Sequence, residues 1–71
     1  MTRIIVKVDG MMCSMCEAHI NTAIRNRFHV KKVRSNRKRK ETVIESEQPL
    51  DREEIKKTIE NTGYIFLGIE E

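Results

Sequence analysis

A chain of 71 residues with 38% hydrophobic and 35% charged residues forms one domain at most, and its thin core excludes a deep substrate cavity. It contains no run of about 18 apolar residues and no basic segment followed by an apolar one, so we expect no membrane insertion, no secretory signal and a cytoplasmic location. The net charge of +3 is unevenly spread, because residues 25–40 hold nine basic and no acidic residues, whereas residues 41–71 hold nine acidic and three basic ones.

The beginning of the chain predicts a strand followed by a helix. Residues 3–8 are rich in β-branched side chains that alternate between two faces, and Gly10 follows as a strand-ending signal. Beyond it, the apolar residues between Cys16 and Ile24 recur at helical spacing and define one buried helix face. Two cysteines therefore stand where a strand passes into a helix.

The middle of the chain predicts a β-hairpin. Residues 30–34 contain two valines and predict the second strand, and residues 41–46 predict the third. Between them, residues 35–39 form a polar, basic segment that is typical of a turn. The hairpin should therefore present a cluster of positive charge at its tip.

The last third of the chain predicts a second helix and a fourth strand. Asp51 is a suitable N-cap, since its carboxylate can accept hydrogen bonds from the first turn. Ile55 and Ile59 form the buried stripe of this helix, and Gly63 ends it. Residues 64–69 then predict the closing strand.

The predicted order is β-α-β-β-α-β over a single domain of residues 1–71. Right-handed crossovers convert this order into an α+β, ferredoxin-like sandwich, in which a four-stranded antiparallel sheet carries both helices on one face. In this topology the loop after the first strand, the hairpin tip near Arg37 and the turn at Gly63 lie at the same end of the molecule. We therefore expect the cysteines, the basic hairpin and this turn to be neighbours.

Cys13 and Cys16 are the candidate metal ligands. Their spacing across a loop-to-helix junction brings two sulfurs together, and the helix N-terminus stabilises thiolates. Thiolates select soft ions such as Cu(I) or Zn(II), but a closed zinc site needs four ligands. A two-sulfur site therefore favours Cu(I). The spacing leaves two alternatives open. The same pair could carry out redox chemistry, or the cysteines could have no functional role, with Cys16 serving as a small hydrophobic residue on the apolar helix face.

Residues 10–16, with the sequence GMMCSMC, resemble the GMxCxxC signature of heavy-metal-associated domains. This family includes copper chaperones of the Atx/CopZ type and the N-terminal domains of metal-transporting P-type ATPases. The similarity covers essentially the whole chain, through the helix stripe ending at Ile24, the V-x-x-V pattern of Val30 and Val33, and residues 59–64.

The resemblance implies roles for individual residues around the metal. Cys13 and Cys16 would be the ligands, and Met11 would be a core anchor behind the loop. Tyr64 is similar to the aromatic residue that bacterial members place beside the site. Zinc-pump relatives often carry an aspartate immediately before the first cysteine, so Met12 at this position favours Cu(I).

Four other residues have side chains that can bind metal ions, but we do not expect them to be ligands. Met12 and Met15 are thioethers that could join a Cu(I) site, but apolar cover over the sulfurs and a soft contact for a partner is the favoured interpretation. His19 is expected at the surface and His29 at the end of the helix, as a cap or strand-edge residue, and neither is expected on the metal.

The basic residues at the hairpin tip, Arg37, Lys38, Arg39 and Lys40, form a candidate docking patch for an acidic partner. Complementary charge would raise the rate of association without holding the partner tightly. A solvated loop is the simpler alternative. Nucleic acid is not expected, because the basic run lacks interleaved aromatic residues and a reading helix.

The sequence therefore predicts a protein without enzymatic activity, which binds one Cu(I) and passes it to a P-type ATPase or a similar metal-accepting protein with an acidic surface. Zn(II), Cd(II) or Hg(II) are the alternative cargoes. A thiol–disulfide oxidoreductase is the alternative activity, although thioredoxin-like proteins place a proline opposite the CxxC and this chain has only Pro49. We expect a monomer without metal, and sharing of one metal by two copies stays open.

Overall fold

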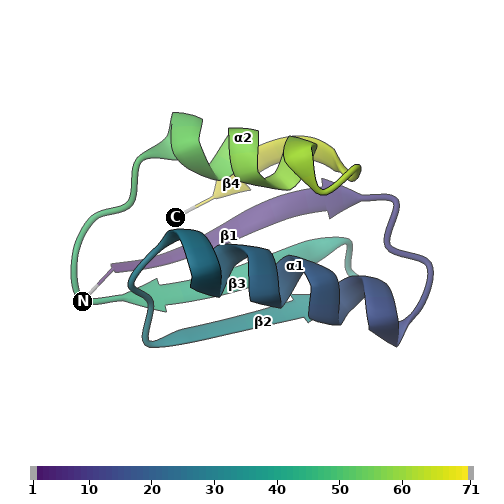
Figure 1. The fold of residues 1–71 in the computed structure, drawn as a ribbon, viewed down its shortest axis with the longest axis horizontal. Coiled ribbons are helices and arrows are strands. Elements are labelled where there is room, and N and C mark those ends of the chain that lie inside the picture. Colours follow the sequence, from purple (N-terminus) through teal and green to yellow (C-terminus); the bar gives the residue numbers. More distant parts are fainter. Residues whose placement is uncertain (1, 71) are drawn as a thin grey trace.

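The computed structural model describes residues 2–70, which form four strands and two helices in the predicted order (Figure 1). The elements are β1 (Thr2–Asp9), α1 (Ser14–Arg27), β2 (Lys32–Asn36), β3 (Glu41–Ser46), α2 (Arg52–Asn61) and β4 (Ile65–Glu70). Both helices cover the same face of the sheet. The predicted ferredoxin-like sandwich is therefore confirmed.

The sheet is antiparallel throughout and has the strand order β2-β3-β1-β4, so β2 and β4 are its edges. Central β1 pairs with β3 from Thr2 opposite Ser46 to Lys7 opposite Glu41. Its pairing with β4 shifts register between Lys7 and Val8, where a bulge interrupts the ladder. Within residues 2–70, no helix covers the other face of the sheet (Figure 1).

The core lies between the sheet and the helices. It consists of apolar side chains that alternate along the strands and recur along the helices, namely Ile4, Val6, Val8, Met11, Ile20, Ile24, Val33, Ile44, Ile55 and Ile59. Asp51 caps α2 as predicted, since its carboxylate accepts hydrogen bonds from the N–H groups of Glu53 and Glu54. The periodicity of the sequence thus fixes which face of each element is buried.

The second strand was predicted two residues too early. Val30 and Val33 are both apolar, but residues three apart cannot share one face of a strand, where side chains alternate with a period of two. Val33 faces the core from β2, whereas half-buried Val30 packs against the core from the loop before it. The strand consequently runs to Asn36, and the turn occupies residues 37–40 in place of 35–39.

The predicted meeting of three loops at one end of the molecule is confirmed by contacts. The N–H of Val8 donates to the carbonyl oxygen of Lys40 at 2.9 Å, which joins β1 to the hairpin. Added at Gly10, a Cβ atom would lie 3.5 Å from the ring of Tyr64, which places the turn after α2 beside the cysteine loop. In Figure 1 these loops lie at the end where α1 begins.

Candidate metal centre

The two cysteines flank the first turn of α1. Cys13 is extended, with φ −155° and ψ 174°, and occupies the N-cap position. Its carbonyl oxygen accepts hydrogen bonds from the N–H groups of Cys16 at 3.1 Å and Glu17 at 3.3 Å, so the backbone curls and returns Cys16 to its side. The Cys13 thiol is exposed and caps no N–H group within residues 2–70, whereas Cys16 is half-buried. One thiol is therefore held by packing and the other is free to move.

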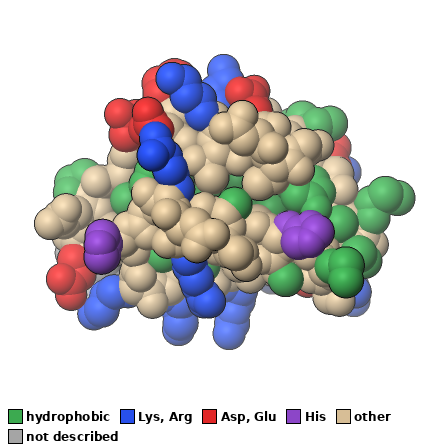
Figure 2. All heavy atoms as spheres, in the orientation of Figure 1, with side chains coloured by type: hydrophobic (Ala, Val, Ile, Leu, Met, Phe, Trp, Pro, Cys, Tyr) green, Lys and Arg blue, Asp and Glu red, His purple; other side chains and the backbone are tan. Residues whose placement is uncertain are grey.

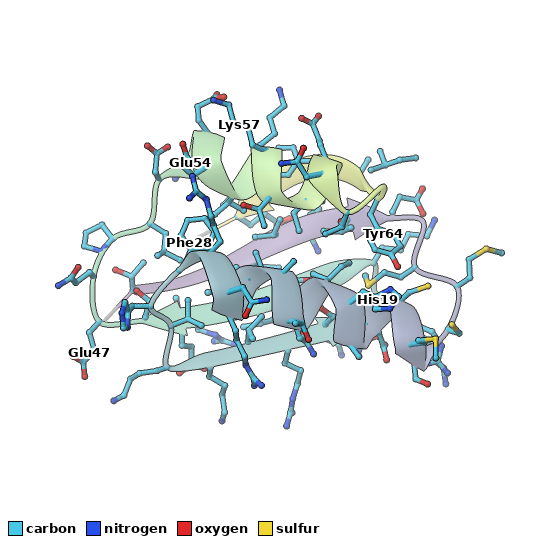
Figure 3. The ribbon with its side chains drawn as sticks, viewed as in Figure 1. His19, Phe28, Glu47, Glu54, Lys57 and Tyr64 are labelled. Carbon is cyan, nitrogen blue, oxygen red and sulfur yellow. The ribbon has the colours of Figure 1, made fainter. Side chains whose placement is uncertain are left out.

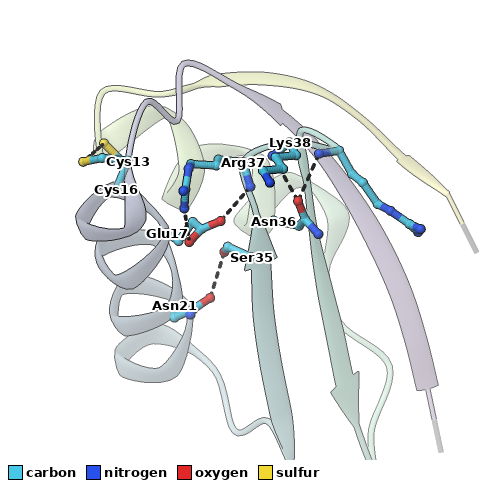
Figure 4. Close-up of polar contacts among 9 residues, drawn as sticks. Cys13, Cys16, Glu17, Asn21, Ser35, Asn36, Arg37 and Lys38 are labelled. Atoms are coloured by element: carbon cyan, nitrogen blue, oxygen red, sulfur yellow. Dashed lines mark hydrogen bonds and ion pairs between the residues drawn. The ribbon is translucent and has the colours of Figure 1, made fainter.

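The sulfur atoms of Cys13 and Cys16 are 3.7 Å apart (Figure 4). With metal–thiolate bonds of ~2.3 Å, this separation corresponds to a sulfur–metal–sulfur angle of about 107°. A straighter two-coordinate arrangement requires the sulfurs to separate to ~4.6 Å. Rotation of the exposed Cys13 side chain can supply this movement without disturbing the core. The pair can thus hold one ion in a bent or an opened geometry.

The environment of Cys16 favours its thiolate. A hydrogen bond from the Tyr64 hydroxyl is the largest cause, and backbone N–H groups at Met12 and Cys13 add to it, so that the pKa of Cys16 falls to about 7 despite partial burial. The same hydrogen bond and burial raise the pKa of Tyr64 to about 12, which keeps its hydroxyl protonated as a donor. Near neutral pH, this thiol loses its proton at little cost, as a soft metal ion requires.

The sequence pattern of the heavy-metal-associated domain matches residues 5–64, a span that includes both cysteines and ends at Tyr64. The chain belongs to the heavy-metal-associated domain family. A comparison with curated protein sequences gives no match.

Solved structures share the heavy-metal-associated fold over nearly their whole length. The CopZ metallochaperone superposes with a TM-score of 0.84 at 22% identity, over 93% of this chain and 100% of that chain. A copper binding domain from HMA7, a P-type ATPase, gives 0.83 at 28% identity over 100% of both chains. The yeast copper transporter domain CCC2A, solved in the apo and Cu(I)-loaded states, gives 0.79 at 29% identity, over 93% of this chain and 94% of that chain. Within residues 2–70, no helix has the length and apolarity needed to cross a membrane.

Methionines surround the cysteine loop of this heavy-metal-associated domain, but only one is buried. Met11 is 9% exposed and belongs to the core cluster, in the position predicted for an anchor behind the loop. Met12 and Met15 are 87% and 67% exposed. Because Cys13 is itself exposed, the expectation that these two side chains shield its sulfur from water is wrong. Figure 2 shows hydrophobic side chains gathered at the end of the molecule where α1 begins.

The histidines do not complete a metal site. Both are exposed, and Figure 3 shows His19 on α1 near the end of the molecule that carries Tyr64. Across residues 2–70, no group of three or more histidine, cysteine, aspartate or glutamate side chains is placed to hold a metal ion. Cys13 and Cys16 therefore stand as a pair, open to a further ligand from outside the chain.

Glu17 ties the cysteine loop to the basic hairpin, a link that sequence reasoning missed. Its carboxylate accepts hydrogen bonds from the backbone N–H of Arg37 at 2.7 Å and from the Arg37 guanidinium at 3.3 Å (Figure 4). The Asn36 side chain also folds the turn by accepting from the N–H of Lys38 at 3.0 Å. The sequence did contain a signal for this link, because an acidic residue follows Cys16 directly and the predicted hairpin of the same domain is basic.

Most of the hairpin charges have acidic neighbours in the chain. Arg39 lies 3.9 Å from Glu41, and Lys40 lies 3.7 Å from Asp9. Of the four predicted docking residues, Lys38 is the one without an ion pair inside residues 2–70. These pairs are exposed on their basic side and are worth about 0–1 kcal/mol each, so a partner can compete for them.

Substitution of Tyr64 by Phe tests the cause of the lowered thiol pKa. Without the hydroxyl, the pKa of Cys16 should rise from about 7 toward its ordinary value of 9.0, because its largest stabilising contact is gone. In the native protein, metal affinity should decline as the pH falls through about 7, where the metal must displace a proton; in Tyr64→Phe this decline should begin at higher pH. Thiolate ultraviolet absorbance against pH measures the shift. Phe28→Leu, also half-buried but away from the thiols, is the control and should leave the curve unchanged.

Proposed function

We propose that this domain binds one Cu(I) between the thiolates of Cys13 and Cys16 and passes it to another protein. The observation that carries the proposal is the pair itself, with sulfurs 3.7 Å apart and one thiol of lowered pKa, in a family of metal-binding domains. The structural likeness to CopZ, to the HMA7 copper binding domain and to CCC2A supports a role in copper trafficking.

The number and kind of ligands favour Cu(I) over other ions. Two soft sulfurs without carboxylate or imidazole help suit a soft ion that accepts low coordination. Zn(II) prefers four ligands in a tetrahedral arrangement, so this chain alone would leave half of its coordination to water or to a second protein. Met12, immediately before Cys13, supplies no oxygen ligand, and its exposed side chain carries a soft thioether sulfur.

The geometry suits transfer by ligand exchange. An incoming thiolate can bond to the metal from the exposed Cys13 side while one resident thiolate leaves. The oxidation states of the metal and the sulfurs do not change. The hydrogen bond from Tyr64 stabilises the Cys16 thiolate when it is released. We propose that a P-type ATPase domain or a similar acceptor with an acidic surface supplies the thiolate in the cytoplasm, where cysteines stay reduced.

Docking of this acceptor would use the hairpin beside the cysteine loop. The exposed ammonium group of Lys38, together with Arg39 and Lys40, whose own acidic neighbours lie 3.7–3.9 Å away, offers charge that an acidic surface could engage. Such contacts raise the association rate more than the affinity, which suits a carrier that must release its cargo.

The thiol–disulfide oxidoreductase alternative fits the structure less well. In such an exchange the attacking thiolate must reach a disulfide sulfur, so the thiol of lowered pKa should be the accessible one. Here Cys16, whose pKa is lowered, is half-buried and hydrogen-bonded to Tyr64. We therefore propose a metal carrier without enzymatic activity.

Titration under anaerobic conditions tests the choice of metal. The reduced protein should take up one equivalent of Cu(I) in competition with a chromogenic chelator, and it should hold Zn(II) far more weakly in a parallel titration, because two thiolates complete the site of one ion and not of the other. Zn(II) binding as tight as that of Cu(I) would replace the copper assignment with a zinc one.

A further inference from the structure

The edge strand β2 has basic side chains on the open face of the sheet, away from the cysteine pair. Lys32 and Arg34 are exposed on the open face of the sheet, two residues apart and hence ~6.6 Å apart along the strand. Together with Arg3 they line a depression of about 140 Å³ that also contains Val43 and Glu45. Three cations therefore surround a single carboxylate.

The helix side of β2 adds a further basic residue. Glu17 of α1 contacts Arg37, and Asn21, one turn further along α1, accepts a hydrogen bond from Ser35 at 2.8 Å. The helix face that contains these two residues therefore runs along β2, away from the hairpin. The next residue of this face is exposed Arg25, which comes level with the middle of β2. Figure 2 shows basic side chains projecting along this lower edge.

These basic side chains differ from most of those at the hairpin because none of them forms an ion pair within residues 2–70. Within residues 2–70, Arg3, Arg25, Lys32 and Arg34 have no acidic group within the 4.0 Å of an ion pair. No strand of residues 2–70 lies on the outer side of β2, so its outward backbone N–H and carbonyl groups are free to pair with another chain (Figure 1).

We propose that the β2 edge binds an extended acidic peptide segment, which adds to the sheet as a fifth strand. Backbone hydrogen bonds to β2 would supply affinity, and acidic side chains at alternate positions would lie opposite Lys32 and Arg34. The matching two-residue period of the two strands fixes this register. Because like charges oppose each other across paired strands, the same residues disfavour pairing of two β2 edges between copies of this chain.

Single-stranded nucleic acid fits this edge less well. Binding of unpaired bases relies on aromatic side chains as stacking platforms. The aromatic side chains of this chain are elsewhere: Phe28 and Phe66 pack against the core, and Tyr64 bonds to Cys16. An acidic strand needs no stacking surface and uses both the charges and the free backbone groups of β2.

Fluorescence anisotropy with a labelled peptide of alternating Glu and Val tests the charge requirement. Charge reversal in Lys32→Glu/Arg34→Glu should weaken binding by at least about tenfold, since two cross-strand attractions become repulsions. The matched control Lys56→Glu/Lys57→Glu makes the same change in net charge on exposed residues of α2 and should change affinity less than about twofold. The milder Lys32→Gln/Arg34→Gln variant guards against misfolding and should lie between the two.

Backbone hydrogen exchange of the peptide complex tests strand addition. Saturating peptide should slow exchange of β2 amides that are otherwise open to solvent, and the effect should be unchanged in the Cys13→Ser/Cys16→Ser double variant, which separates this site from the metal site. Binding without protection of β2, equal binding of a Gln/Val peptide, or displacement of the peptide by an oligonucleotide of equal or higher affinity would each overturn the proposal.

Discussion

Replacement of either cysteine by serine should lower the Cu(I) affinity of this domain by more than about a hundredfold, since loss of a mere outer partner of a metal ligand already costs ~10–100-fold. A serine hydroxyl is hard and stays protonated at neutral pH, so it does not substitute for a thiolate. Because the proposed site consists of the Cys13 and Cys16 thiolates, each single variant would remove half of its coordination. Competition titrations of Cys13→Ser and Cys16→Ser against a chromogenic chelator measure the loss.

The control for these variants lies inside the same loop. Ser14 is exposed, occupies the first helical position and is not expected on the metal, so Ser14→Ala should keep its Cu(I) affinity within about twofold. Circular dichroism should show all three variants folded, because Cys13 and Ser14 are exposed and Cys16 is only partly buried against the core. A single-serine variant that binds Cu(I) as tightly as the native protein would refute the thiolate pair as the site.

Much of this site could be predicted because its determinants are local in the sequence. The alternation of Ile4, Val6 and Val8 identifies β1, and a spacing of three residues places Cys13 and Cys16 across a helix start. Topology then joins the cysteine loop to the turn at Gly63, and contacts confirm that meeting. Each of these steps needs only periodicity and chain order.

The rest depends on side chains that meet across the fold, which no local pattern encodes. The lowered pKa of Cys16 requires the Tyr64 hydroxyl to reach it from the other half of the chain. The pairing of Arg37 with Glu17 follows from the packing of α1 against the β2 end of the sheet. Exposure of Met12 was missed for the same reason, since an apolar residue in a surface loop has no periodic pattern to indicate its direction.

Core substitution should have a larger effect on folding than any change at the site. Ile24 is fully buried, two helical turns beyond Cys16, so Ile24→Ala should lower the free energy of unfolding by ~2–5 kcal/mol through lost burial and a residual cavity. A domain of this size has a total stability of only ~4–11 kcal/mol. Urea denaturation of the metal-free protein measures the change, and Ile65→Ala, on a side chain that is 57% exposed, is the matched control expected within about 0.5 kcal/mol.

Metal should restore part of this loss, because an ion that binds the folded state more tightly than the unfolded chain stabilises the folded state. Free Cu(I) buffered at about a thousand times its dissociation constant would add ~4 kcal/mol, reduced by any binding to the unfolded cysteines. Ile24→Ala should therefore unfold at a higher urea concentration in buffered Cu(I), whereas Ile24→Ala combined with Cys13→Ser and Cys16→Ser should not. If copper raised the stability of the triple variant equally, the stabilising ion would be bound away from the cysteine pair.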